Sequence, residues 1–296
     1  MTFNPDAQVD SSKASKTGRN TAIGVGGGGV VVLALLVVSQ LLGVDLTGLA
    51  PALTGGDQSQ QQGTDGGVDN CTTGQQANEN VECRMAAAAL VIDTYWAKEL
   101  PELGSQYHSP GFTLFSGSTD TGCGAASSAT GPFYCPQDET IYLDTSFYQE
   151  LQDRFGSSGG PLAQMYVLAH EWGHHIQNIT DINKNLNLQD TGPASDSVRL
   201  ELQADCFAGA WVAAASTELD ANGQPFLQPI TQAQINDALS AASAVGDDHI
   251  SEVTGTAVRP DTWTHGSSNQ RQHWFIAGTS GGPNACNTFQ VSGPDL

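Results

Sequence analysis

The chain has 296 residues, which is enough for one large domain or two small ones. It carries 10 Lys and Arg residues against 31 Asp and Glu residues, which gives a formal net charge of −21. A surface of that sign repels a phosphate backbone, so the composition argues against nucleic-acid binding.

The first 44 residues divide into a polar tail, residues 1–20, and a charge-free segment, residues 21–44. A bilayer is spanned by about 20 apolar residues, and basic residues precede this segment. The pattern predicts a single transmembrane signal anchor in the cell membrane, with a cytoplasmic N-terminus and an extracytoplasmic domain. The alternative is a cleaved signal peptide, because Ala50-Pro51-Ala52 resembles an A-x-A site, although it lies far beyond the apolar run.

Residues 45–70 are rich in Gly, Gln, Asp and Ser and have little apolar content. This composition predicts a flexible linker. The folded part is therefore expected to begin near Cys71, and residues 71–296 are long enough to bury a hydrophobic core.

All six cysteines follow the apolar segment, and none forms a C-x-x-C pair. This argues against a thiolate zinc site and favours disulfides formed outside the cytoplasm. Six cysteines allow 15 pairings, and buried free thiols are the alternative. The spacing favours two local bridges and one long one: Cys71–Cys83, Cys123–Cys135 and Cys206–Cys286.

The predicted fold class is α+β and mostly helical, with a small sheet. Apolar periodicity indicates the helices, and alternation with β-branched or aromatic residues indicates the strands. Pro101 is expected to end the first helix and Gly246 to cap the last one. The expected helices are 86–100, 162–179, 197–217 and 230–245, and the expected strands are 112–115 and 140–144.

The helix over 162–179 contains His170-Glu171-Trp172-Gly173-His174, an H-E-x-x-H motif. Residues four apart share one face of a helix, so His170 and His174 can bind one Zn²⁺ ion together. Glu171 lies where it could take a proton from water at that ion. His175 cannot share this face and is expected to be a structural hydrogen-bonding residue.

Zinc in a catalytic site needs a third protein ligand and an open position. The third histidine of H-E-x-x-H-x-x-G-x-x-H is absent between Ile179 and Asp181. Glu201 and Asp205 lie four apart on the next predicted helix, so both face one side. We assign Glu201, with its longer side chain, as the ligand, and Asp205 as the acceptor of a ligand histidine's N–H. The reverse assignment is the alternative, and so is a solvated carboxylate pair.

Five segments together carry a family resemblance: 131–136, 141–144, 170–177, 197–209 and 264–271. They resemble the bacterial family of "putative neutral zinc metallopeptidases", in that family's order and over roughly residues 71–296. The resemblance implies a membrane-anchored, zincin-like domain of the gluzincin type, where the third ligand is Glu. It implies His170, His174 and Glu201 as metal ligands and Glu171 as the catalytic base.

Other polar residues have open roles. His265 and Arg271 are candidates for stabilising an oxyanion, with a loop histidine and a structural arginine as equal alternatives. Tyr142 lies on a strand that could pair with an extended substrate, although a core aromatic is favoured. His249 follows two aspartates, where a capped helix end is favoured over a second cation site.

The function predicted from these observations is membrane-anchored, extracytoplasmic zinc metallopeptidase, with protein or peptide substrates and the membrane as partners. Two alternatives stay open. The first is a catalytically silent zincin-like binding or scaffold protein of the cell envelope. The second is a zinc amidase acting on cell-wall peptides. The sequence leaves the oligomeric state open.

Overall fold

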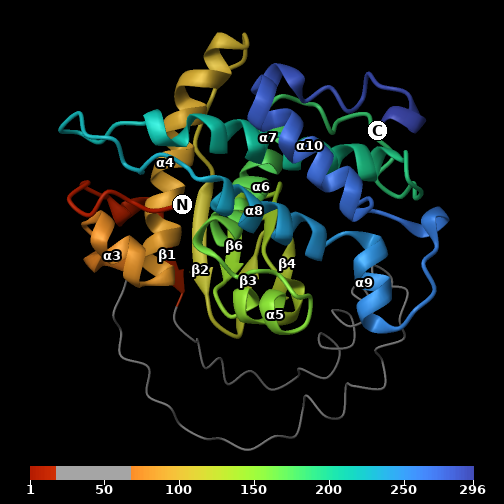
Figure 1. The fold of residues 1–296 in the computed structure, drawn as a ribbon, viewed down its shortest axis with the longest axis horizontal. Helices are drawn as coiled ribbons and strands as arrows, with labels where there is room; N and C mark the ends of the chain where they lie inside the picture. The colour runs from red at the N-terminus through yellow and green to blue at the C-terminus, as the bar shows by residue number, and fades with distance from the viewer. Residues whose placement is uncertain (18–67) are drawn as a thin grey trace, which may run out of the picture.

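The computed structural model describes residues 1–17 and 68–296. It is a mixed α/β fold, about 52% helical, with two small sheets. Figure 1 shows the long helices α4, α6, α7 and α10 gathered beside the strands. Helix α7 packs against both α6 and α10, so these three helices form one continuous layer.

All four predicted helices are present, with shifted ends. Pro101 lies inside the last turn of α4 instead of ending it, and Gly246 is the N-cap of α9 instead of a C-cap. The helix α10 and the short helices α3, α5 and α9 were not predicted. The helices are α3 (Gly74–Glu79), α4 (Val81–Glu102), α5 (Phe147–Asp153), α6 (Pro161–Ile179), α7 (Asp196–Ala214), α8 (Gln232–Ala244), α9 (Asp247–Thr254) and α10 (Ser268–Gly281).

The larger sheet has four strands in the order β1-β2-β6-β5. The β1–β2 and β2–β6 pairs are parallel, and β5 runs antiparallel to β6. Strand β6 is therefore internal, and β5 is the free edge nearest to α6. The strands are β1 (Ser15–Thr17), β2 (Gly111–Phe115), β5 (Phe133–Cys135) and β6 (Thr140–Asp144), and β3 (Ser118–Thr121) and β4 (Gly124–Ser127) form a separate hairpin.

The N-terminal residues pack onto the domain. Met1 and Phe3 are buried, and the Phe3 backbone exchanges two hydrogen bonds of 2.9 Å with the Asn78 side chain. Strand β1 extends the larger sheet. The predicted fold class, a mostly helical α+β domain preceded by a transmembrane helix, is therefore wrong: the described residues form a mixed α/β fold that includes the N-terminal residues. The low apolar content of the tail concealed this packing, because only six of residues 1–17 are buried.

Within the two described ranges, none of the helices combines the length and the apolar character needed to cross a bilayer. The predicted transmembrane segment, residues 21–44, lies outside these ranges, as do residues 45–67 of the predicted linker. The last linker residues, 68–70, form a 3-10 helix in which Val68 is buried.

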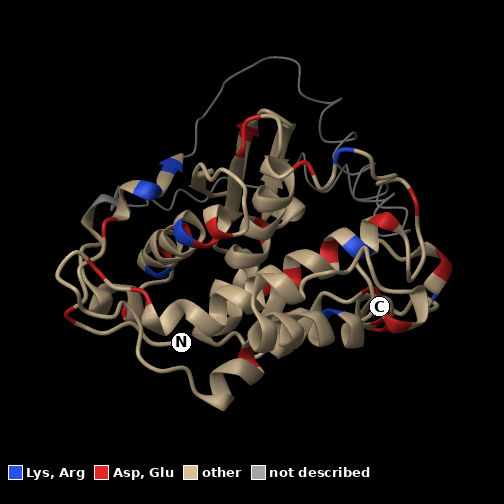
Figure 2. Ribbon diagram, turned by 90° about the horizontal axis from the view of Figure 1, so that it is seen from above, with Lys and Arg blue, Asp and Glu red and all other residues tan. Residues whose placement is uncertain are grey.

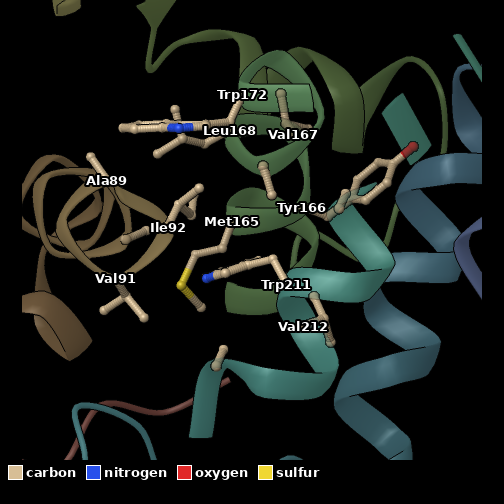
Figure 3. Packing of buried hydrophobic residues seen from close by; sticks show 14 of the residues in the cluster. Ala89, Val91, Ile92, Met165, Tyr166, Val167, Leu168, Trp172, Trp211 and Val212 are labelled. Carbon is tan, nitrogen blue, oxygen red and sulfur yellow. The ribbon is translucent and has the colours of Figure 1, made fainter. Parts of the chain in front are cut away.

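The hydrophobic core holds the helices in place. Figure 3 shows Val91 and Ile92 of α4 facing Met165 of α6, with Trp211 of α7 beside it. All four side chains are fully buried. Burying a side chain of this size contributes about 1.5–3 kcal/mol each, so this cluster fixes α6 against its neighbours.

Glycines let the three site helices approach closely. A Cβ on Gly173 of α6 would lie 2.9 Å from the Ala204 Cα of α7. A Cβ on Gly209 would lie 2.1 Å from the Phe275 carbonyl oxygen, and one on Gly278 1.9 Å from the Cys206 carbonyl oxygen. Helices α6, α7 and α10 therefore meet backbone to backbone, which brings short side chains within reach of each other.

The predicted disulfides are all confirmed: Cys71–Cys83, Cys123–Cys135 and Cys206–Cys286. The described cysteines leave no free thiol. The third bridge joins α7 to the segment that follows α10. It therefore links the two helices that pack closely at Gly209 and Gly278.

Replacing both Cys206 and Cys286 with Ala is expected to lower the free energy of unfolding by about 4 kcal/mol, because this bridge closes a loop of 80 residues. That corresponds to a fall in Tm of about 10 °C by calorimetry. The matched variant Cys71→Ala/Cys83→Ala removes a bridge between cysteines only 12 residues apart, so its free energy of unfolding should fall by less. An unmoved Tm in the first variant would contradict the structural role of the bridge.

Candidate metal centre

Three side chains from α6 and α7 converge on one point. His170 Nε2 lies 3.1 Å from Glu201 Oε2 and 3.2 Å from His174 Nε2, and His174 Nε2 lies 3.4 Å from Glu201 Oε1. Zinc–ligand bonds of about 2.1 Å at tetrahedral angles place ligand atoms about 3.4 Å apart. The observed spacing therefore fits a tetrahedral ion bound by these three residues. In the described part of the chain, no other His, Cys, Asp or Glu group converges in this way.

The hydrogen bonds of the histidines turn both Nε2 atoms toward Glu201. His170 Nδ1 lies 2.8 Å from Asp205 Oδ1, a carboxylate that can only accept. His174 Nδ1 lies 2.8 Å from Gln177 Oε1, and Gln177 Nε2 donates to the Leu200 carbonyl, which fixes the orientation of that amide. Each Nδ1 is therefore a donor, and each Nε2 faces the metal site, where it can bind a metal ion in place of a proton.

The electrostatic surroundings favour a cation at this point. Burial disfavours a charged His170, but Asp205 and Glu201 outweigh burial and raise the pKa of His170 to about 10. Burial would raise the pKa of Glu201, but the two histidines hold it well below its usual range. These three residues therefore favour positive charge at this point, which a metal ion can supply in place of a proton.

Glu171 lies on α6, directly after the first histidine. Its side chain is nearly buried, at 8% exposure, and no described residue donates a hydrogen bond to its carboxylate. The carboxylate is therefore free to accept a proton from another molecule. This placement agrees with the predicted base role.

Asp205 is fully buried behind the histidines. Its Oδ1 accepts hydrogen bonds from His170 Nδ1, from the Tyr166 hydroxyl and from Arg271 Nη2. Arg271 Nε also donates to Oδ2, at 2.8 Å. The structure thus places Asp205 behind His170, on the side away from Glu201, and places Glu201 at the convergence point.

His265 lies in the loop before α10. Its Nδ1 lies 3.0 Å from Thr264 Oγ1 and 3.4 Å from Asp247 Oδ1. Asp247 Oδ2 also accepts the backbone N–H groups of Thr264, His265 and Gly266 at 2.8–2.9 Å. Burial lowers the pKa of His265, but Asp247 and Glu201 outweigh it and raise that pKa overall. His265 is therefore close enough to Glu201 for the two charges to interact.

The remaining candidates lie elsewhere. Tyr142 is on the internal strand β6, stacks on Phe133 and donates to Asp138, so a substrate strand cannot pair with it. His249 Nε2 lies 2.9 Å from the Phe155 carbonyl oxygen and joins no metal-binding group among the described residues. His175 is fully buried and contacts the His108 carbonyl oxygen and the Tyr134 hydroxyl.

Three residues of the site had no predicted role: Tyr166, Gln177 and Asp247. Tyr166 precedes His170 by four residues and Gln177 follows His174 by three, so helical spacing could have placed both near the ligand face. Asp247 is distant in sequence from His265, and no sequence signal joins the two.

The sequence matches the family described as "Putative neutral zinc metallopeptidase" over residues 4–289. Uncharacterized protein YpfJ of Escherichia coli is 38% identical over 295 residues, which cover 97% of this chain and 95% of that protein. An uncharacterized protein of Mycobacterium tuberculosis is 48% identical over 227 residues, 76% of each chain. No solved structure matches the chain significantly.

Proposed function

Because this chain belongs to the family described as "Putative neutral zinc metallopeptidase", we propose that it hydrolyses peptide bonds with a zinc ion held by His170, His174 and Glu201. The observation that supports this most strongly is the convergence of three ligand atoms, one from each of these residues, within 4.8 Å of one another. When bound, zinc lowers the pKa of a coordinated water to about 7 and polarises a carbonyl oxygen.

In this proposal Glu171 is the general base. Its carboxylate takes a proton from the attacking water and delivers that proton to the leaving amine. The near burial of Glu171 supports the role, because proton transfer between groups shielded from solvent avoids competition with bulk water.

We assign oxyanion stabilisation to His265. Asp247 holds the backbone of residues 264–266 and faces His265 Nδ1, which leaves Nε2 to donate to a substrate carbonyl oxygen. Arg271 was the other candidate for this role. Its guanidinium instead contacts Asp205 and the Val245 carbonyl oxygen, behind His170.

Replacing His265 with Ala is expected to lower kcat by about 10²–10³-fold, which is the usual effect of losing one oxyanion donor. The zinc content should stay unchanged, because His265 is not a ligand. Steady-state kinetics and metal analysis on the same preparation measure both quantities. His249→Ala is the matched control, and an equal kcat for His265→Ala and the native protein would remove His265 from the reaction.

The free edge at β5 supports an extended peptide as substrate. The Tyr134 hydroxyl accepts a hydrogen bond from the Asn178 side chain and contacts His175, so β5 is fastened to α6. A peptide paired with this edge would lie along the helix that carries the ligands. Figure 2 shows many Asp and Glu residues and few Lys and Arg residues over the described ribbon. The net charge of −21 therefore favours neutral or basic peptides over acidic ones.

The compartment follows from the cysteines. Three disulfides persist in oxidising surroundings and are rare in a reducing cytoplasm. We therefore place the domain outside the cytoplasm.

A chelator tests the proposal. Cleavage of an unstructured protein such as casein should stop when the metal is removed with 1,10-phenanthroline, and adding about one equivalent of Zn²⁺ should restore it. Restoration by Zn²⁺ but not by Mg²⁺ supports the nitrogen and oxygen donor set. Cleavage that persists in the metal-free protein would contradict the proposal.

A further inference from the structure

Arg271 has its charged group buried among the residues behind the metal centre. Its side chain is only 4% exposed, and its two contacts with the Asp205 carboxylate, Nε–Oδ2 at 2.8 Å and Nη2–Oδ1 at 3.0 Å, form a bidentate pair. Arg271 Nη1 also donates to the Val245 carbonyl oxygen at 3.2 Å. A guanidinium held at three points in this way fixes the plane of the carboxylate that it contacts.

The fixed carboxylate is the one that orients a proposed ligand. Asp205 Oδ1, which accepts from Arg271 Nη2, lies 2.8 Å from His170 Nδ1. The Tyr166 hydroxyl donates to the same oxygen. We propose that Arg271 is a positioning residue for the metal centre, which acts through Asp205 to hold His170 in its metal-binding orientation. The inference rests on the proposed function, since it concerns the same site.

The helix crossing explains how α10 delivers this arginine. Gly209 and Gly278 let α10 lie directly on the α7 backbone, and the Cys206–Cys286 bridge starts at the residue after Asp205. Arg271 is in the first turn of α10 and its N–H bonds to the Ser267 carbonyl, within a capping box formed by Ser267 and Gln270. The helix that carries Arg271 is thus fixed at its start and along its length.

The charge balance gives Arg271 its effect. A carboxylate with no exposed surface is unfavourable unless a cation compensates it, and Arg271 supplies that charge. Without Arg271, no bidentate pair would hold the plane of the Asp205 carboxylate, and Asp205 would be free to turn away. That turn would remove the acceptor from His170 Nδ1, and losing such a partner typically weakens metal binding by about 10–100-fold.

The test is a double-mutant cycle on zinc affinity, which is measured without substrate. The full-length native protein, Arg271→Met, Asp205→Asn and the double variant are each titrated with Zn²⁺ against a chromogenic chelator. We expect Arg271→Met to raise the Kd for zinc by about 10–100-fold. We expect the double variant to bind no more weakly than Asp205→Asn, because Arg271 acts through Asp205. Arg259→Met is the matched control, since Arg259 pairs with Asp261 on the surface.

Each outcome decides the inference. An unchanged Kd in Arg271→Met would overturn it, and so would fully additive losses in the double variant. If thermal unfolding shows that Arg271→Met does not fold, Arg271→Lys takes its place. That variant keeps the charge but loses the bidentate geometry, so a Kd equal to the native value would again overturn the inference. A native protein that binds no zinc would instead refute the proposed function on which the inference rests.

Discussion

Replacing Glu171 with Gln is expected to lower kcat by about 10²–10⁴-fold while one zinc ion per chain stays bound. Gln has nearly the shape of Glu, so the helix and both histidines should keep their places. The Gln side chain cannot act as a base, however. No other described carboxylate lies close to the metal ligands without already accepting hydrogen bonds. The loss should therefore appear in kcat, with little change in KM.

The measurement combines steady-state kinetics with metal analysis of the same samples. Glu252→Gln serves as the matched control, because Glu252 is exposed on α9, away from the ligands. If Glu171→Gln hydrolysed substrate at the native rate, Glu171 would not be the general base. Loss of zinc from this variant would show that Glu171 helps to build the site and would leave its catalytic role unproven.

Replacing Glu201 with Ala should empty the metal site. It removes one of three ligands, and the loss should exceed the roughly 10–100-fold weakening that follows removal of an outer partner. Because zinc binds the folded state, native protein at a zinc concentration of about 1,000 Kd gains about 4 kcal/mol of stability. The variant should lose this gain, so added zinc should raise the native Tm and leave the variant's Tm unmoved.

Asp205→Asn is the informative comparison for Glu201→Ala. Asp205 contacts His170 Nδ1, whereas the proposed ligand atom of that ring is Nε2. Asp205→Asn should therefore still bind zinc, with a lower affinity than the native protein, whereas Glu201→Ala should not bind it. An unchanged zinc stoichiometry in Glu201→Ala, with loss in Asp205→Asn, would reverse the two assignments.

The elements that carry the ligands could be predicted because each is local. The H-E-x-x-H motif and the pair Glu201 and Asp205 each have the spacing of one helix face, and each lies in a long segment rich in apolar residues. Sequence alone could not show that α6 and α7 meet through Gly173 and Ala204. That crossing brings Glu201 to the histidines.

Other features depend on contacts between distant residues. Arg271 and Asp205 are 66 residues apart, so the ion pair between them could not be predicted from the sequence. Helix α10 lacks a clear apolar stripe, and the capping box at Ser267 and Gln270 was the only local sign of its start. The N-terminal residues read as a polar tail because their stability comes from pairing with β2 and with Asn78, which local pattern cannot show.

The most direct test of the account is digestion of a mixed-sequence peptide library by the full-length protein in H₂¹⁸O, with products identified by mass spectrometry. The account predicts new peptide ends, with one ¹⁸O atom in each new carboxylate. It also predicts that cleavage depends on zinc and disappears in Glu171→Gln protein that still binds zinc. Zinc-loaded native protein that leaves both this library and purified cell-wall peptides uncut would contradict the hydrolase assignment and favour a binding or scaffold role.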